Sequence, residues 1–218
     1  MFKISKHYSK VLTTVFLSVA FIACTKDKIR ENTTVDPVLA FASGANKNSP
    51  AAHIAASEKL VIPAAVDLPT NLPNGNTRVA TYYAIGVQKY KAREKAGTYP
   101  LTYEWVFVAP QADLYDATNT KVGSHGAGPF WQSSAADSIF AQQFSPPKTA
   151  SSPDAGSIDW LLLMPKTGTT PTGIFSEVDY IQRIATAGGK APAEPPTSAT
   201  QTIEVKYKAV YRFTKQNS

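Results

Sequence analysis

The chain contains few of the residue types on which covalent stability and catalysis usually depend. Of its 218 residues, one is cysteine, three are histidine and 17% are charged. A single cysteine permits neither an intrachain disulfide nor a thiolate metal site. The lysines and arginines are scattered and form no run that could follow a phosphate backbone, so no nucleic-acid partner is expected. Stability must come from a packed core, for which ten Phe, ten Tyr and three Trp provide the apolar area.

The sequence also lacks the short motifs of common enzyme classes. It has no Gly-x-Ser-x-Gly nucleophile elbow, no P-loop and no Gly-x-Gly-x-x-Gly after a strand, so nucleotide cofactors are not expected. Two of the three histidines precede the expected domain. A metal site would need His125 together with carboxylates such as Asp113, Asp137 or Asp159, and this set is too sparse to predict one. We therefore predict neither a metal nor a cofactor.

The one long apolar run lies at the N-terminus. Basic residues precede it, it extends over residues 11–23, and the small residue Ala23 stands immediately before Cys24. Such a segment has the length and polarity of a signal peptide and is too short to span a bilayer. A cysteine directly after it resembles the lipobox of bacterial lipoproteins, in which this cysteine is lipidated and becomes the mature N-terminus. The alternatives are a plain secretory signal with an incidental cysteine and an uncleaved anchor.

This resemblance predicts the location and the boundaries of the chain. Residues 1–23 would be a lipoprotein signal peptide, and lipid on Cys24 would bind the mature protein to the bacterial cell envelope, at the periplasmic or the surface side of the outer membrane. Residues 24–57 are rich in Asn, Thr, Ser, Ala and Lys, which predicts a flexible tether. Residues 58–218 are then expected to form a single β domain.

The expected domain shows the pattern of strands. In residues 202–213 apolar and aromatic side chains alternate with mostly polar ones, which predicts a strand with one buried and one wet face. Two Pro-rich stretches, at residues 145–153 and 191–196, are expected to be long exposed loops. We predict an all-β fold, an antiparallel β-sandwich or barrel with long Pro- and Gly-rich loops. Further strands are expected at residues 79–90, 101–108, 138–144, 160–164 and 178–186.

The most unusual segment is residues 123–131, where three glycines surround His125 and Pro129 precedes two aromatic residues. Glycine allows tight turns and close approach of the backbone to another group. His125 could be a general base, a hydrogen-bond donor to a ligand or a metal ligand. In the alternative interpretation the glycines only shape a turn, His125 bonds to the main chain and Trp131 belongs to the core.

A continuous apolar segment at residues 160–164 predicts a strand that is buried on both faces. Asp159, which precedes it, would lie at the edge of the strand, where a carboxylate can meet solvent or a partner. Arg183, on the strand expected at residues 178–186, is predicted to form a partly buried ion pair with Asp159 or Asp137.

Six blocks of residues, in order along the chain, resemble the pattern of a known family. They are Gly86-Val87-Gln88-x-Tyr90, Trp105-x-Phe107-x-x-Pro110-x-Ala112-x-Leu114, Val122-Gly123-x-His125-x-Ala127-Gly128-Pro129-x-Trp131, Trp160-Leu161-Leu162-Leu163, Ile181-Gln182-Arg183-Ile184-x-Thr186-x-Gly188-Gly189-x-Ala191-Pro192 and Val205-x-Tyr207-x-Ala209-x-Tyr211-x-Phe213. Together they resemble domain of unknown function 3455, a family of secreted proteins in bacteria and fungi. The similarity extends from about Leu60 to Phe213.

The resemblance implies a mostly β domain outside the cytoplasm, and it implies no activity. Many members of the family carry one cysteine after the first block and another after the fifth, which implies a disulfide. Here Ala92 and the region of Glu194 and Pro195 occupy these neighbourhoods, so both cysteines are absent together. Joint loss is what a structural bond predicts, and it leaves the expected fold unchanged.

Two hypotheses of function follow from these residues. In the first, the domain is a lipid-anchored structural or binding module with a concave, aromatic patch that suits a glycan or another small molecule. The candidate ligand-binding residues are Gln88, Trp105, His125, Trp131 and Arg183. In the second, it is a hydrolase or lyase in which His125 acts as the base and Asp137 or Asp159 orients it. An exposed His125 within reach of a carboxylate would favour the enzyme, and a His125 sealed against the main chain would disfavour it.

Overall fold

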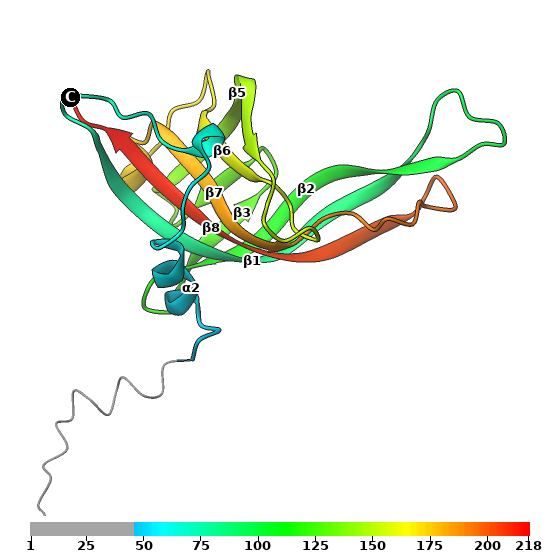
Figure 1. Cartoon of the computed structure of the whole chain (residues 1–218), viewed down its shortest axis with the longest axis horizontal. Helices are drawn as coiled ribbons and strands as arrows, with labels where there is room; N and C mark the ends of the chain where they lie inside the picture. Colours follow the sequence, from blue (N-terminus) through cyan, green and yellow to red (C-terminus); the bar gives the residue numbers. More distant parts are fainter. Residues whose placement is uncertain (1–45) are drawn as a thin grey trace, which may run out of the picture.

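The computed structural model describes residues 46–218, and one antiparallel sheet of eight strands forms most of this part (Figure 1). The expected signal peptide, the lipid site at Cys24 and residues 24–45 of the expected tether lie outside the described residues. The all-β prediction is confirmed. The strands are β1 (Asn76–Glu94), β2 (Tyr103–Tyr115), β3 (Lys121–Gly126), β4 (Phe130–Gln132), β5 (Ser138–Ala150), β6 (Trp160–Pro165), β7 (Tyr180–Gly188) and β8 (Thr202–Gln216).

The sheet closes into a ring because its first and last strands pair with each other. Every strand is antiparallel to the next one along the chain, and β8 returns to pair with β1 from Lys91↔Thr202 to Asn76↔Gln216. Of the two predicted architectures, the closed sheet corresponds to the barrel-like one and not to two separate packed sheets. The ends of β1 and β2 continue past the ring as a long hairpin (Figure 1).

All six segments predicted as strands overlap strands of the sheet, although β2 and β7 each begin two residues later than predicted, and two further strands were not expected. β3 and β4 form a short hairpin that includes residues 123–131, the segment for which one of the two interpretations was a glycine-rich turn. Glycine is required in this hairpin because the strands approach closely: a Cβ on Gly123 would lie 2.0 Å from the carbonyl oxygen of Gln132. Glycine has a low strand propensity, so the sequence did not indicate a strand here, although the close pairing of the two strands requires glycine at position 123.

The inner face of the closed sheet holds an apolar core rich in aromatic rings. The indole of Trp131 makes edge-to-face contacts with the rings of Tyr211 and Phe213, at centroid distances of 5.1 and 5.6 Å. Leu163 of β6 and Ile181 of β7 pack in the same cluster. The alternation predicted for β8 places Tyr211 and Phe213 in this interior, as expected for a strand with period two.

A second apolar cluster lies on the outer face, under the segment that precedes β1. Helix α2 (Pro50–Ser57) and the 3₁₀ turn η1 (Ala64–Val66) contribute Ile54 and Val66 to it. These side chains pack with Leu162 of β6 and Val210 of β8. The strand β6 is thus buried on both faces, as predicted. The predicted wet face of β8 is wrong for Val210 and Arg212, which are buried because this segment covers them.

The prediction that the tether extends to residue 57 is also wrong in its last part. Ser49 caps α2 by accepting a hydrogen bond from the amide of Ala52 at 3.2 Å, and Pro50 occupies its first turn, where no amide donor is needed. The imidazole of His53 stacks on the ring of Tyr83 at 4.5 Å. Residues 50–57 therefore belong to the folded part of the chain, and the predicted boundary at residue 58 falls inside it.

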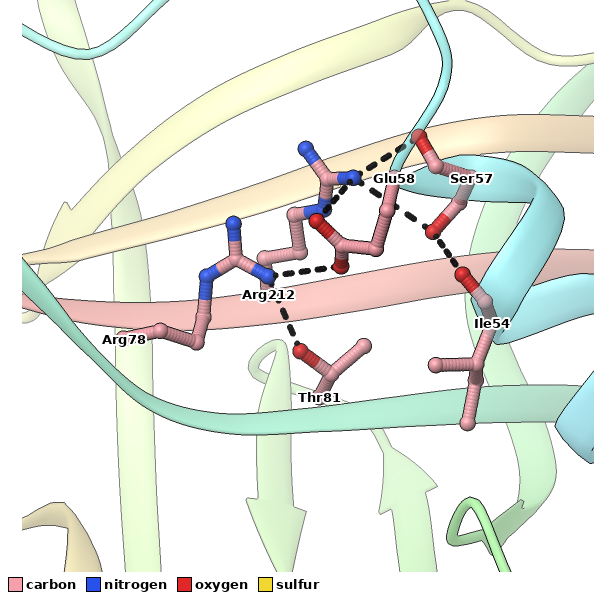
Figure 2. Close-up of polar contacts among 6 residues, drawn as sticks. All are labelled: Ile54, Ser57, Glu58, Arg78, Thr81 and Arg212. Carbon is pink, nitrogen blue, oxygen red and sulfur yellow. Dashed lines mark hydrogen bonds and ion pairs between the residues drawn. The ribbon is translucent and has the colours of Figure 1, made fainter.

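A buried arginine fixes the end of α2 to the sheet. Figure 2 shows Glu58 between Arg212 of β8 and Arg78 of β1, with oxygen–nitrogen distances of 3.1 Å to each guanidinium. Arg212 is only 6% exposed, and it also donates to the carbonyl oxygen of Ser57 at 2.8 Å. Burial lowers the pKa of Arg212, and the carboxylate of Glu58 acts in the opposite direction. The carboxylate thus compensates a charge that would be costly if left alone under the helix.

The two Pro-rich stretches have different structures. Residues 191–196 form a loop between β7 and β8, as predicted. Residues 145–150 instead belong to β5, so the loop prediction is wrong there. Gln143 pairs with Leu163 and Lys148 pairs with Leu162, which leaves the intervening residues as a bulge. Proline cannot donate to the ladder, and a bulge lets the strand continue past it.

Candidate functional site

The interior of the closed sheet is not completely filled, and it contains a cavity of about 320 Å³. This volume is at the small end of the range typical of ligand-binding sites. The cavity is enclosed by the whole sheet, because every strand contributes at least one side chain to its wall. In strand order these are Gln88, Phe107, His125, Trp131, Gln143, Leu161, Arg183 and Tyr211.

A second hollow of about 390 Å³ adjoins the cavity and shares five lining residues with it, including Gln88 and Arg183. Asp159 and Lys190 line only this outer hollow. Phe107 lines both spaces and is half exposed. The interior of the sheet is thus continuous with solvent through a mouth that carries apolar and charged groups.

His125 is sealed inside the wall of the cavity by two hydrogen bonds. Its Nδ1 lies 2.8 Å from the main-chain oxygen of Phe130, and because a carbonyl can only accept, Nδ1 carries the hydrogen. Its Nε2 is then the acceptor for the hydroxyl of Tyr211, at 3.1 Å. The β3–β4 hairpin pairs His125 with Trp131 and stacks the two rings at 4.5 Å.

This environment keeps His125 neutral. Its side chain is buried, and the resulting desolvation lowers its pKa to about 3, although the bond to Phe130 acts in the opposite direction. Both ring nitrogens are occupied within the protein, and neither bonds to a carboxylate among residues 46–218. The imidazole is therefore a fixed, uncharged part of the wall. It lacks the orienting carboxylate that the hydrolase or lyase hypothesis requires.

The two candidate carboxylates lie elsewhere. Asp137 closes the loop between β4 and β5, where the hydroxyl of Ser134 donates to it at 2.8 Å and the amide of Ile174 at 3.1 Å. These bonds, that of Ser134 first, lower the pKa of Asp137. Asp159 lines the outer hollow. The structure thus does not bring either carboxylate to His125.

Arg183 and Gln88 place polar groups in the wall of the cavity, and these groups have few hydrogen-bond partners within the described part of the protein. The predicted ion pair of Arg183 with Asp159 or Asp137 is wrong: its Nε and Nη2 donate instead to the main-chain oxygen of Asp159, at 3.0 and 2.7 Å. Within residues 46–218 no carboxylate forms an ion pair with Arg183. Gln88 is only 2% exposed, yet in this part of the chain its amide nitrogen has no hydrogen-bond partner.

Trp105 is the one predicted ligand-binding residue that lies outside the cavity. It is on the protruding β1–β2 hairpin, opposite Ala92, and its indole N–H donates to the main-chain oxygen of Glu194 at 2.9 Å. Its neighbours Ala92 and Glu194 thus belong to the two regions in which the family resemblance implies a pair of cysteines. The role of Trp105 is to join the hairpin to the loop between β7 and β8.

Tyr211 is a wall residue that the sequence did not single out. The alternation of β8 predicted that it is buried, but the same pattern describes an ordinary core residue. Burial raises the pKa of Tyr211, so its hydroxyl keeps the hydrogen that it donates to His125. Only the closure of the sheet, which brings β8 opposite β3, shows that these two residues form one wall.

Residues 46–218 contain neither a cluster of metal ligands nor a membrane-spanning helix. No three His, Cys, Asp or Glu side chains in this range come close enough together to hold a metal ion. In the same range, no helix has both the length and the apolar character needed to cross a membrane.

The fold and the cavity define a class of protein: a closed antiparallel sheet with a small, partly polar cavity inside it. The chain belongs to the DUF3455 family of proteins of unknown function, whose family model matches residues 73–215. The resemblance found in the sequence is thereby confirmed, and the match covers all eight strands almost completely. No curated protein and no solved structure matches the chain.

Proposed function

We propose that the protein binds a small molecule inside its closed sheet. The observation that carries this proposal is the cavity, which all eight strands line and in which the buried amide of Gln88 has no partner among the described residues. A polar group buried without a hydrogen bond destabilises the folded state and is rare in native structures. A ligand that accepts this hydrogen bond would remove that cost and fill the space.

The arrangement of the wall supports binding rather than catalysis. Catalysis by His125 would need a nitrogen that can take up a proton near neutral pH. Its low pKa and its two internal hydrogen bonds remove this capacity. The same bonds hold its ring rigidly against Trp131, as is useful in the wall of a preformed binding site.

We also propose that the binding module is attached to a bacterial envelope membrane through lipid on Cys24, at the outer membrane in particular. The support for this proposal is the sequence of residues 11–24, an apolar segment of signal-peptide length that ends in Ala23-Cys24. Helix α2 begins at Pro50, so 25 residues separate the proposed anchor from the folded part.

A cavity-filling variant tests the proposed binding. Ala109 lines the cavity, so Ala109→Phe should occupy the space that a ligand would use. The matched control is Ala199→Phe, which places the same ring on an exposed loop. Thermal-shift screens with glycans and small amphipathic compounds should identify compounds that stabilise the wild type and the control but not Ala109→Phe. Equal stabilisation of all three proteins by every active compound would contradict the proposal.

A further inference from the structure

We infer that the ligand of this cavity is a small anion with an apolar body, whose charged group binds at Arg183 and Gln88. The inference rests on the proposed function and specifies its ligand class. It follows from the charge of the wall, from the unpaired donor and from the apolar residues around them.

The wall of the cavity carries one formal charge, and it is positive. Arg183 is the only lining residue that is charged at neutral pH, because burial keeps His125 neutral. The main-chain oxygen of Asp159 orients two N–H groups of Arg183 but does not neutralise the guanidinium. At the outer hollow, Lys190 and Asp159 carry opposite charges, so the net charge around the opening also remains positive. A partly buried guanidinium without a counterion favours an anion.

Gln88 adds a hydrogen-bond donor to the same two spaces that Arg183 lines. Gln88 and Arg183 line both the cavity and the outer hollow, and the Gln88 side chain is almost fully buried. The last torsion of a glutamine side chain is broad, so a small rotation can present the unpaired amide N–H groups to a ligand oxygen. A carboxylate, sulfonate or phosphate oxygen accepts from both an amide and a guanidinium. A group with only donors would satisfy neither.

Apart from Gln143 and the hydrogen-bonded pair of His125 and Tyr211, the rest of the wall is apolar, which predicts the other part of the ligand. Phe107, Val108, Leu161 and Leu163 line the cavity, and the first two are about half exposed to solvent. An apolar ligand body would cover these side chains and remove them from water. A neutral sugar would place hydroxyl groups against them and leave Arg183 without a counterion. The wall therefore favours an amphipathic anion over a neutral glycan.

Two matched pairs of probes separate charge from shape. Anilinonaphthalene sulfonate and neutral phenylnaphthylamine share an aromatic body, and both fluoresce when they enter an apolar site. Phenylbutyrate and neutral phenylbutyramide, used as competitors, present a carboxylate instead of a sulfonate. The affinities are measured with the wild-type chain, with Arg183→Gln, Arg183→Lys and Gln88→Leu, and with Arg93→Gln as the control. Arg93 lies on the protruding hairpin, where its exposed side chain pairs with Glu104.

We expect each anion to bind the wild type at least about tenfold more tightly than its neutral partner. Arg183→Gln should abolish this preference, Arg183→Lys should retain part of it, Gln88→Leu should reduce it, and Arg93→Gln should leave it unchanged. Circular dichroism and thermal unfolding of each variant are measured in parallel, so that a loss of binding can be distinguished from a loss of structure. If only one of the two anions shows the preference, the inference is supported for that anionic group and contradicted for the other.

The contradicting outcomes are distinct for the two proposals. If the neutral probes bind as tightly as the anions, and Ala109→Phe prevents their binding, the cavity binds ligands but the inferred class is wrong. A charge preference that survives in Arg183→Gln would overturn the role of Arg183. If no probe binds, or if Ala109→Phe binds all probes like the wild type, the proposed function itself is contradicted.

Discussion

The hydroxyl oxygen of Tyr211 lies 3.1 Å from Nε2 of His125, and this contact joins β8 to β3 across the interior of the closed sheet. The other nitrogen of the imidazole bonds to the main chain of Phe130 within the β3–β4 hairpin. One buried histidine therefore connects the short hairpin to the opposite side of the sheet. The two hydrogen bonds that hold His125 in the wall of the cavity therefore also stabilise the fold.

Removal of this hydroxyl should destabilise the protein. Tyr211→Phe leaves Nε2 of His125 as a buried acceptor without a donor, and we expect the free energy of unfolding to fall by about 1–3 kcal/mol. Tyr99 is fully exposed, so Tyr99→Phe is the matched control and should have almost no effect. Chemical denaturation followed by circular dichroism measures both. Equal stability of the two variants would show that the contact with His125 contributes nothing.

The neutral state of His125 predicts a specific dependence of stability on pH. Its pKa is about 3 in the folded protein and near the ordinary value of 6.5 in the unfolded chain. As the pH falls below 6.5, the unfolded chain takes up a proton that the folded protein does not, so stability decreases until about pH 3. Between about pH 7.5 and pH 5, this residue should account for a loss of about 2 kcal/mol.

Variants of two histidines isolate this contribution. Denaturation of the wild type and of His125→Asn at a series of pH values should show a clearly smaller loss in the variant. His53→Asn is the control. The pKa of His53 is also lowered, mainly by burial, so its contribution to the pH dependence of stability must be separated from that of His125. If the pH profiles of the wild type and His125→Asn are parallel, His125 is not held neutral in the folded state.

The ion pairs of Glu58 should stabilise the attachment of α2. Glu58→Gln removes the carboxylate that compensates the buried Arg212, and we expect a loss of about 1–3 kcal/mol in the free energy of unfolding. Glu177→Gln is the control: it removes an exposed ion pair with Lys215, so the free energy of unfolding should change little. Limited proteolysis should also cut residues 50–57 faster in Glu58→Gln than in the wild type. Equal cleavage rates would argue against an anchoring role of the pair.

Membrane attachment can be tested at a single atom, the sulfur of Cys24. We expect the wild-type protein to fractionate with membranes and to gain mass from lipid. Cys24→Ser should be released in soluble form or remain unprocessed, because serine cannot accept the thioether-linked lipid. Mass spectrometry and membrane fractionation of both proteins provide the measurement. Unchanged processing and unchanged membrane association of Cys24→Ser would contradict the proposal.

Most of the fold could be predicted because strand periodicity is a local signal. The alternation in β8 and the apolar segment of β6 both indicated strands, and both are present. The short strand β3 was missed because its glycines are poor strand formers, although Gly123 is needed for close pairing, and β4 was missed because it has only three residues. Helix α2 was missed because it is short and contributes few apolar side chains to the outer cluster, with Ile54 the main one.

The site was predictable in part, because its residues come from separate strands. Gln88, His125, Trp131 and Arg183 were candidates by residue type, and the closed sheet brings all four to one cavity. Trp105 was a candidate for the same reason, but its strand extends past the ring and carries it away from the site. The contact of Tyr211 with His125 depends on ring closure, which no local pattern in the sequence specifies.

The most direct test of the account is to locate a bound anion on the protein by methyl NMR. We expect anilinonaphthalene sulfonate to shift the methyl resonances of Leu161 and Leu163, which line the cavity. The methyl groups of Val61 and Leu72, which are highly exposed and outside the cavity, should not shift. Saturable shifts at Leu161 and Leu163, lost in Ala109→Phe, would support ligand binding inside the closed sheet. Shifts confined to exposed groups such as Val61 and Leu72 would contradict it.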